Sequence, residues 1–389
     1  MADKPNKKIR SGQNTSTSIE AFSDADEARA TGLVRILGEN GKASGPAPDL
    51  SPADLVRMFE GMLQSRLLDE ILCDLQNQGR LGIWYPTRGQ EAAVIAGAHA
   101  LHKEDYLVPG RRESYAAIYR GLPLRAYLAQ ILGNANDGAH GRQSPGLVGS
   151  LAIRHVSASS SVASHLPHAT GLAWAARIRG DKIAVLCFMN EGATSQDDFQ
   201  SALNFAAVFK APVVFVCQNG AETTTLTGSR TVAMKGLAFG VPSVRVDGND
   251  VLALYFVIKS ALDQARLGRG ASFIEAVTCP VSERQQDTAQ YETKDPLRRF
   301  GAWLDEQKIL SRHAQQVAHA RLQEELLTAL AAEEPAGAPS SPSMFDDVLA
   351  EPNWLIEEQR AEHLRSCKRR TPKYGLSGNS GPAAGPARG

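Results

Sequence analysis

Hydrophobic residues in the middle of the chain gather into short apolar runs, and stretches with helical spacing separate these runs. Short apolar runs predict β-strands, and apolar residues three and four positions apart predict helices. The expected strands are Ile183 to Met189, Pro212 to Cys217, Ser243 to Val246 and Ser272 to Val277, with helices at Gln196 to Phe209 and Val251 to Leu267. Strands that alternate with helices form a parallel sheet covered on both faces. We therefore expect an α/β fold with a doubly wound, mostly parallel sheet.

Helical patterns also flank this region on both sides. Ser51, Pro52 and Asp54 form a typical helix start, and apolar residues recur at helical spacing until Gly79 ends the helix. Further helices are expected at Gly89 to Leu101, Leu124 to Leu132, His313 to Glu333 and Trp354 to Ser366. The sheet should therefore carry helical N- and C-terminal extensions.

Composition separates one α/β domain from polar ends. We expect a disordered tail at residues 1–30, which have few apolar side chains, and another at 371–389, which are rich in Gly, Pro and Ala. A segment rich in Pro and Ser separates the last two helices. The predicted division is an α/β domain at 31–335, a linker and helix at 336–370, and the two tails.

Charge and hydropathy exclude several classes of protein. Lys and Arg number 42, and so do Asp and Glu, so no net field attracts nucleic acid or an anionic membrane. No apolar run approaches the ~20 residues that cross a bilayer, and the first residues lack the apolar segment of a secretory signal. The five cysteines have no metal-site spacing and are expected to be reduced thiols. We expect a cytoplasmic protein that binds neither nucleic acid nor membrane.

Candidate chemistry lies between Phe188 and Asn219. The first strand of this stretch leads into a tight turn that carries the carboxylate of Glu191, and the next strand ends at Asn219. Neighbouring parallel strands would bring both side chains to the carboxyl end of the sheet, where α/β proteins bind ligands. A hard cation that holds a diphosphate prefers such oxygen ligands. Asn219 as a simple cap of the strand-to-loop turn is an equally open interpretation.

Seven segments in unbroken order resemble a single family. They are LQNQGR (75–80), RGQEAA (88–93), GRQSP (141–145), SSVASHLPHATGLAWAAR (160–177), NEGATSQDDF (190–199), ALNFAAVFKAPVVFVCQN (202–219) and VRVDGNDVLALY (244–255). They resemble the alpha subunit of the thiamine-diphosphate-dependent decarboxylating component of 2-oxo acid dehydrogenase complexes, of the branched-chain or pyruvate type. The resemblance runs from about Leu33 to about Arg365. It implies the thiamine-diphosphate-binding fold, with thiamine diphosphate and Mg²⁺ as cofactors.

The resemblance also implies which residues bind the cofactor. Glu191 matches the acidic metal ligand of the family, Gly192 and Ala193 match the rest of its turn, and Asn190 replaces a glycine. Asn tolerates the left-handed backbone region better than most residues, so this replacement is acceptable. Gly220 stands where the family has its metal-binding Asn, so Asn219 or the Glu222 carboxylate is expected to compensate. The expected metal ligands are therefore Glu191, Asn219 and Glu222.

Two arginines and two small residues complete the expected cofactor site. Arg112 matches an arginine that pairs with the diphosphate, and Arg111 beside it suits an anion as well. Ser160 and Val162 match positions where the family contacts the cofactor with a hydroxyl and an apolar side chain. Trp84 and Tyr85 match an aromatic patch near the substrate cavity of the family.

Other positions depart from the family pattern. Gln218 replaces an arginine, and the segment Thr278 to Phe300 lacks the histidine that the family carries in a mobile loop. A second family histidine, after Gly141, is also absent. Histidine is the side chain best suited to proton transfer near neutral pH. The catalytic residues therefore stay unassigned.

Two functions follow from the resemblance and the departures. In the first, the chain pairs with a beta subunit as an α2β2 heterotetramer, decarboxylates a small 2-oxo acid and passes the acyl group to a lipoyl-bearing acyltransferase component. In the second, it is a degenerate, non-catalytic paralogue that acts as a structural or regulatory partner with impaired cofactor binding. We take the first as the expected function, with a branched-chain substrate because the turn contains Glu191 rather than Asp.

Overall fold

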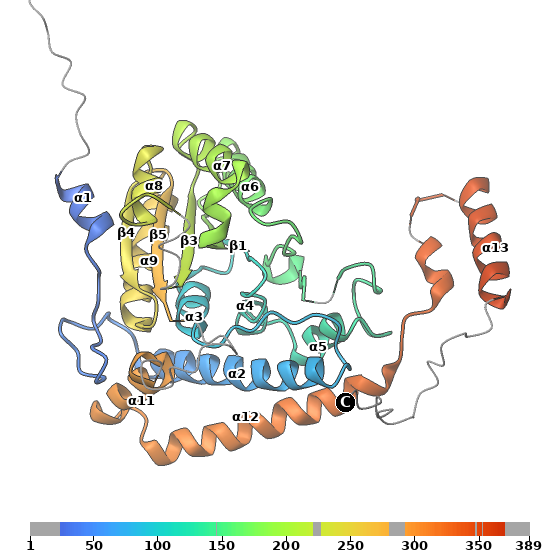
Figure 1. Ribbon diagram of the computed structural model, residues 1–389, viewed down its shortest axis with the longest axis horizontal. Helices are drawn as coiled ribbons and strands as arrows, with labels where there is room; N and C mark the ends of the chain where they lie inside the picture. The colour runs from blue at the N-terminus through green and yellow to red at the C-terminus, as the bar shows by residue number, and fades with distance from the viewer. Residues whose placement is uncertain are drawn as a thin grey trace, which may run out of the picture.

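The computed structural model describes residues 24–144, 146–220, 227–279, 292–346, 348–351 and 353–369. Within them, five strands form one sheet between helices (Figure 1). The strands are β1 (Tyr106–Val108), β2 (Val185–Asn190), β3 (Val213–Gly220), β4 (Ser243–Asp247) and β5 (Ser272–Thr278). Their order is β1-β2-β3-β5-β4, and every neighbouring pair is parallel. The predicted parallel α/β fold is confirmed.

Helices cover both faces of this sheet. The main ones are α2 (Pro52–Asn77), α3 (Glu91–Ala100), α5 (Leu124–Leu132), α6 (His165–Arg179), α7 (Asp197–Val208), α9 (Val251–Arg266), α11 (Pro296–Glu306), α12 (Arg312–Glu333) and α13 (Trp354–Arg369). Shorter ones are α1 (Asp24–Thr31), α4 (Ala116–Tyr119) and α8 (Ala233–Ala238). None in the described part of the chain is long and apolar enough to cross a membrane.

Strand residues alternate between two cores, which explains why the strands are apolar throughout. Leu186 and Phe188 of β2 pack into the core that also contains residues of α2, α3 and α9. Val185 and Cys187 face the other side, toward residues of α6 and α7. Successive side chains of a strand point to opposite faces, so a strand covered on both sides must be apolar at every position.

Helix α3 approaches the sheet closely because it has a glycine at the contact. A Cβ placed on Gly97 would lie 2.6 Å from Cζ of Phe188 and 2.9 Å from a methyl carbon of Leu186. Real side chains do not tolerate such distances. The small residue therefore sets the spacing between α3 and β2, whose carboxyl end reaches the site described below.

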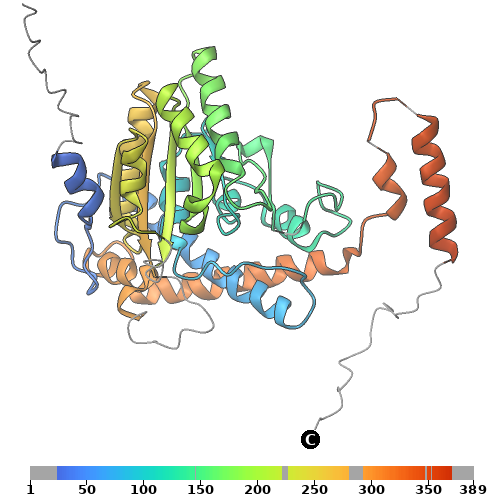
Figure 2. The same cartoon turned by 45° about the horizontal axis from the view of Figure 1, so that its top comes forward.

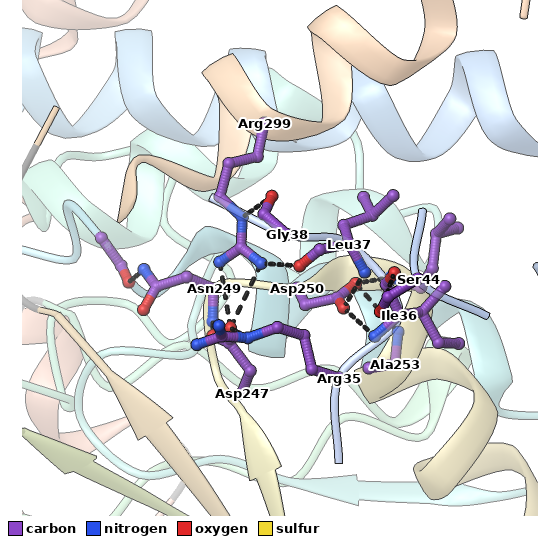
Figure 3. Close-up of polar contacts among 12 residues, drawn as sticks. Arg35, Ile36, Leu37, Gly38, Ser44, Asp247, Asn249, Asp250, Ala253 and Arg299 are labelled. Atoms are coloured by element: carbon purple, nitrogen blue, oxygen red, sulfur yellow. Dashed lines mark hydrogen bonds and ion pairs between the residues drawn. The ribbon is translucent and has the colours of Figure 1, made fainter. Parts of the chain in front are cut away.

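A buried carboxylate anchors the segment that precedes α2. Asp250 caps the N-terminus of α9, where it accepts hydrogen bonds from the backbone N–H groups of Leu252 and Ala253. It also accepts hydrogen bonds from the backbone N–H groups of Ile36 and Leu37 at 2.6 Å (Figure 3). One side chain thus joins the N-terminal segment to the helix after β4.

A fully buried arginine adds a second connection at the same place. Arg299 of α11 donates from Nη1 to Asp247 at 3.1 Å and from Nε to the carbonyl oxygen of Gly38 at 3.2 Å (Figure 3). Arg35 donates to the same carboxylate at 2.7 Å. Since a buried charge requires partners, this cluster fixes α11, β4 and the N-terminal segment to one another.

Both outer strands of the sheet are partly covered by neighbouring backbone. Beside β4, the N–H group of Val34 donates to the carbonyl oxygen of Arg245, and the N–H group of Asp247 donates to Val34. Beside β1, Leu107 exchanges a similar pair of hydrogen bonds with Arg154 and Val156. Short segments outside the sheet therefore occupy polar groups at both edges.

The two ends of the described chain differ in how they pack. Helix α1 overlaps the end of the predicted tail at 1–30, and its Ala30 is buried against Ala233 and Leu237 of α8. Helix α12 runs along α2 beneath the sheet (Figure 1). Helix α13 stands away from the sheet in both views (Figure 2) and packs against the short 3-10 segment Ser341–Phe345.

Candidate active site

A cavity of about 240 Å³ opens where β1, β2 and β3 end. Three segments supply most of its wall: the loop after β1, the segment that leads into α6, and the turn after β2. Carboxyl ends of parallel strands are the usual ligand sites of α/β proteins. The cavity therefore lies where the sequence predicted a site.

Two arginines line this cavity from the loop after β1. Nη1 of Arg111 donates a hydrogen bond to the hydroxyl of Tyr85 at 3.0 Å, and its guanidinium lies 5.2 Å from the centre of the Tyr85 ring. Arg112 is half-buried beside it. Guanidinium groups suit phosphate oxygens because they offer paired donors. Tyr85 thus holds one arginine in position, and both predicted arginines face the cavity.

The structure separates the two predicted substrate aromatics. Tyr85 lines the cavity, whereas Trp84 is buried beneath α2 and does not line it. The indole Nε1 of Trp84 donates to Oδ1 of Asp69 at 2.7 Å. Trp84 therefore packs in the core, and Tyr85 is the one of the pair that can face a ligand from this chain.

The turn after β2 is built around Asn190. Its side-chain oxygen accepts a hydrogen bond from the backbone N–H of Ala193 at 3.2 Å, which starts the 3-10 helix Glu191–Ser195. Asn190 and Ala193 line the cavity, whereas Glu191 and Gly192 are half-buried outside its lining. Asparagine at this position therefore folds the turn by capping it, with an extended backbone (φ −97°) rather than a left-handed one.

The segment before α6 supplies small side chains and one buried histidine. Val162, Ser159 and Ser161 line the cavity, while Ser160 is exposed outside it. His165 also lines the cavity, and its Nε2 donates to the carbonyl oxygen of Phe188 at 2.8 Å. Burial lowers the pKa of His165. A neutral imidazole fixed to the backbone of β2 serves as a wall rather than as a free base.

The predicted metal ligands do not come together among the described residues. Nδ2 of Asn219 donates to Oε1 of Glu275 on β5 at 2.8 Å. Gln218 points into the cavity, and successive strand residues face opposite ways, so Asn219 faces away from it. Glu222 lies outside the described residues. Within these residues, no three His, Cys, Asp or Glu side chains could hold a metal ion.

A buried pair at the cavity wall escaped the sequence analysis. Nε2 of Gln218 donates to Oε1 of Glu113 at 2.5 Å, and both residues line the cavity. Burial raises the pKa of Glu113 to about 7, against the opposing effects of the Arg112 charge and nearby backbone amides. The sequence signal was the replacement of a family arginine by Gln218, but nothing pointed to Glu113 as its partner.

Comparison with known proteins places the chain in a family. The family described as "Dehydrogenase E1 component" matches residues 60–340. The chain belongs to this family. This E1 chain is 32% identical over 360 residues to 2-oxoisovalerate dehydrogenase subunit alpha 2, mitochondrial, of Arabidopsis thaliana, a match that covers 88% of the chain and 76% of the relative. It is 36% identical over 292 residues to pyruvate dehydrogenase E1 component subunit alpha of Staphylococcus aureus (strain Mu50 / ATCC 700699), covering 70% and 76%.

The comparisons confirm the resemblance that the motifs indicated. Both relatives are alpha subunits, one of a 2-oxoisovalerate dehydrogenase and one of a pyruvate dehydrogenase. The matched region of the E1 chain contains every strand of the sheet and all the residues that line the cavity. The site described above therefore belongs to the part of the chain that defines the family.

Proposed function

We propose that this chain is the alpha subunit of a 2-oxo acid dehydrogenase, which decarboxylates a 2-oxo acid oxidatively and passes the acyl group to a lipoyl group. One observation carries the proposal. The cavity at the strand ends is lined by Arg111, Arg112, Val162, Asn190 and Ala193, which are residues that the family resemblance assigns to the cofactor. A 2-oxo acid of the branched-chain or the pyruvate type is the proposed substrate.

The cavity suits thiamine diphosphate in charge and in polarity. Two guanidinium groups line one side of the cavity and could pair with the oxygens of a diphosphate. Val162, Met189 and Ala193 give an apolar surface for a ring, and the unpartnered buried oxygens of Gln90 and Gln218 remain to accept from its donors. Bound thiamine diphosphate would supply the electron sink that stabilises the carbanion left by decarboxylation. Ser160, Glu191 and Gly192 remain proposed cofactor contacts.

The side chains of this subunit would bind and orient the cofactor. Arg112 and Arg111 would hold the diphosphate, and Tyr85 keeps the Arg111 guanidinium at the cavity wall. Val162 and Ala193 would exclude water from the apolar part of the cofactor, which strengthens polar contacts there. Tyr85 is the proposed contributor to the substrate wall, and Trp84 would support it only from the core. No residue of the described chain is assigned a proton-transfer step.

The described donors do not fit a Mg²⁺ ion by themselves. Magnesium requires oxygen ligands in a near-octahedral arrangement, whereas Glu275 holds the Asn219 side chain so that it faces away from the cavity, and Gly220 offers no side chain. Within the described part of the chain, Glu191 is the one carboxylate among the predicted ligands, since Glu222 lies outside it. Whether cofactor binding depends on Mg²⁺ is therefore a quantity to be measured.

An exposed apolar face supports association with a beta subunit. The ring of Trp174 on α6 stacks on Phe209, the residue that follows α7, with centroids 4.1 Å apart, and Phe205 of α7 stacks on Phe209 at 5.7 Å. Ile178 and Val208, on the same two helices, are 70% and 67% exposed. Contiguous exposed apolar surface of this kind marks protein interfaces. The proposed assembly is an α2β2 heterotetramer in the cytoplasm that delivers acyl groups to a lipoyl-bearing acyltransferase.

The second candidate is a non-catalytic paralogue that has lost its cofactor. The orientation of Asn219 and the absence of a side chain at Gly220 favour it, because both remove expected metal ligands. This protein would keep the fold and the apolar face and act as a structural or regulatory partner. Fold and interface packing do not depend on a filled site, so binding must be measured.

Calorimetric titration of thiamine diphosphate, with and without Mg²⁺, decides between the two candidates. We expect binding to the full chain that strengthens with a co-expressed beta-type subunit, followed by decarboxylation of 2-oxo acids. Arg112→Ala should weaken binding roughly ten- to a hundredfold, since hydrogen bonds to charged groups contribute about 1.5–3 kcal/mol. Arg312→Ala, on an exposed part of α12, is the matched control and should change nothing. No binding heat, even with the partner present, would favour the paralogue.

A further inference from the structure

Buried oxygens without hydrogen-bond partners gather at the candidate active site. Among the described residues, three side-chain oxygens are buried and unpartnered: Oε1 of Gln90, Oε2 of Glu113 and Oε1 of Gln218. All three residues line the cavity at the strand ends. An unsatisfied buried polar group destabilises a protein by about 1–3 kcal/mol. Three such groups at one cavity indicate that a bound ligand supplies their hydrogen-bond partners.

The Glu113–Gln218 contact determines where a proton on Glu113 would reside. Nε2 of Gln218 can only donate, so Oε1 of Glu113 must accept at their 2.5 Å contact. A proton on this carboxyl therefore belongs on Oε2, which has no hydrogen-bond partner, although the backbone amides of Gly110, Arg112 and Glu113 favour the ionised form. This oxygen packs against Gly110, where a Cβ would lie only 2.7 Å from it. Because Glu113 lines the cavity, this unpartnered oxygen is the position from which a protonated carboxyl would donate to a ligand.

The groups around Glu113 allow it to hold a proton. Arg112 on its own loop and the Cys187 thiol on β2 are the charged or titratable groups that interact with it, and neutral Gln218 faces it from β3. Arg111 and His165 line the same cavity. Burial already raises the pKa of Glu113 to about 7. A bound anion would raise this pKa further, because a like charge nearby disfavours ionisation.

We propose that Glu113 is protonated when the ligand is bound and donates a hydrogen bond from Oε2 to an anionic oxygen of the diphosphate. Binding then converts the carboxylate and one proton from solvent into a neutral carboxyl, with no other bond made or broken. This inference rests on the proposed function, since that function supplies the diphosphate. Glu113 becomes a binding residue that the family resemblance did not assign, and it limits the pH range in which the site binds its ligand.

The consequence for affinity follows from proton linkage. Above the pKa of Glu113 in the free chain, each pH unit should lower the affinity for diphosphate by about tenfold, because one proton must be taken up. Below that pKa the carboxyl is already protonated and the dependence disappears. Glu113→Gln replaces the carboxyl by a neutral amide, whose oxygen can accept from Gln218 and whose nitrogen can donate to the ligand. The affinity of this variant should therefore lack the pH dependence that comes from Glu113.

Proton uptake can be counted by calorimetry in two buffers of different ionisation enthalpy at about pH 8.5. The probes are thiamine diphosphate with Mg²⁺ and inorganic pyrophosphate, each titrated into the full chain with the beta-type subunit present. We expect the wild-type chain to take up about one proton more than Glu113→Gln. Protons that the probe itself binds or releases are the same for both chains, so they cancel in this difference. Glu324→Gln, an exposed glutamate of α12, should match the wild type.

Each result of this experiment has one meaning. Equal proton uptake by wild type and Glu113→Gln with both probes overturns the inference, and thiamine diphosphate binding would then leave the proposed function intact. Glu113-dependent uptake with pyrophosphate but no binding of thiamine diphosphate supports the inference and contradicts the proposed function. If neither anion binds at any pH, both are wrong.

A second readout does not need the variant, should Glu113→Gln fail to fold. Infrared difference spectra of the wild-type chain, recorded on addition of pyrophosphate at about pH 8.5, should gain the C=O band of one protonated carboxyl. The band should shift in heavy water, as expected for an exchangeable proton. A spectrum without this band would overturn the inference.

Discussion

His155 is buried beside β1, and neither of its ring nitrogens forms a hydrogen bond with the described residues. Burial lowers its pKa to about 3, and the nearby charge of Arg120 acts in the same direction. The unfolded chain binds a proton at this residue below its ordinary pKa of about 6.5, whereas the folded chain does not. Stability should therefore fall as pH falls through the window from about 6.5 to about 3.

Replacing this residue tests the prediction directly. His155→Phe keeps a ring of similar size and should remove a loss of about 2 kcal/mol between neutral pH and pH 5. Urea unfolding of both chains at several pH values would measure it. His319→Gln, on an exposed face of α12, should leave the pH profile of stability unchanged. Parallel profiles for wild type and His155→Phe would contradict the assignment.

Single residues also show how far the site could be predicted from the sequence. The cavity is lined by residues at or just after the ends of β1 and β2: Arg111, Arg112 and Asn190. Their place could be predicted because parallel strands end at the same edge of the sheet. Asn219 faces the other way because one position along a strand reverses the side chain, and the apolar pattern does not fix that parity. Glu113 gave no signal of its own, since its partner lies 105 positions away in the chain.

At the scale of elements, the packing of α3 on β2 makes a prediction about glycine. Alanine within a helix is more favourable than glycine by about 1 kcal/mol. Gly97→Ala should nevertheless destabilise the protein by roughly 1–3 kcal/mol, because its Cβ would overlap the buried Phe188 and Leu186 side chains. Gly171→Ala on α6 is the matched control: nothing lies within 4 Å, so it should stabilise the isolated chain. Thermal unfolding that ranks the two variants in the opposite order would refute this account.

The elements that the pattern predicted are the long, strongly apolar ones. Four strands and the helices α2, α5, α7, α9 and α12 lie within a few residues of their expected bounds, because burial on a fixed face leaves a regular spacing. Strand β1 has three residues and α8 has six, too few to show a period. The polar composition of helix α1 gave no apolar pattern from which to predict it. Its buried residue, Ala30, has an apolar partner only in the folded protein, where α8 packs against it.

At the scale of the whole molecule, the exposed face of α6 and α7 predicts an assembly. Phe205→Glu places a charge on a side chain that is 51% exposed, so it should leave folding intact. The same charge in an apolar interface would be desolvated without a partner and should abolish association with a beta-type subunit. Analytical ultracentrifugation of co-expressed chains measures this. Phe256→Glu, on the exposed side of α9, is the control and should still assemble; equal assembly by both variants would exclude this face.

The covered edges of the sheet have a consequence for the behaviour of the protein at high concentration. An open edge strand presents free N–H and C=O groups on which another chain can add a strand, which is a common start of aggregation. Val34 occupies such groups beside β4, and the segment around His155 occupies those beside β1. Loss of either short segment would expose an edge strand of the sheet, on which other copies of this protein could add a strand.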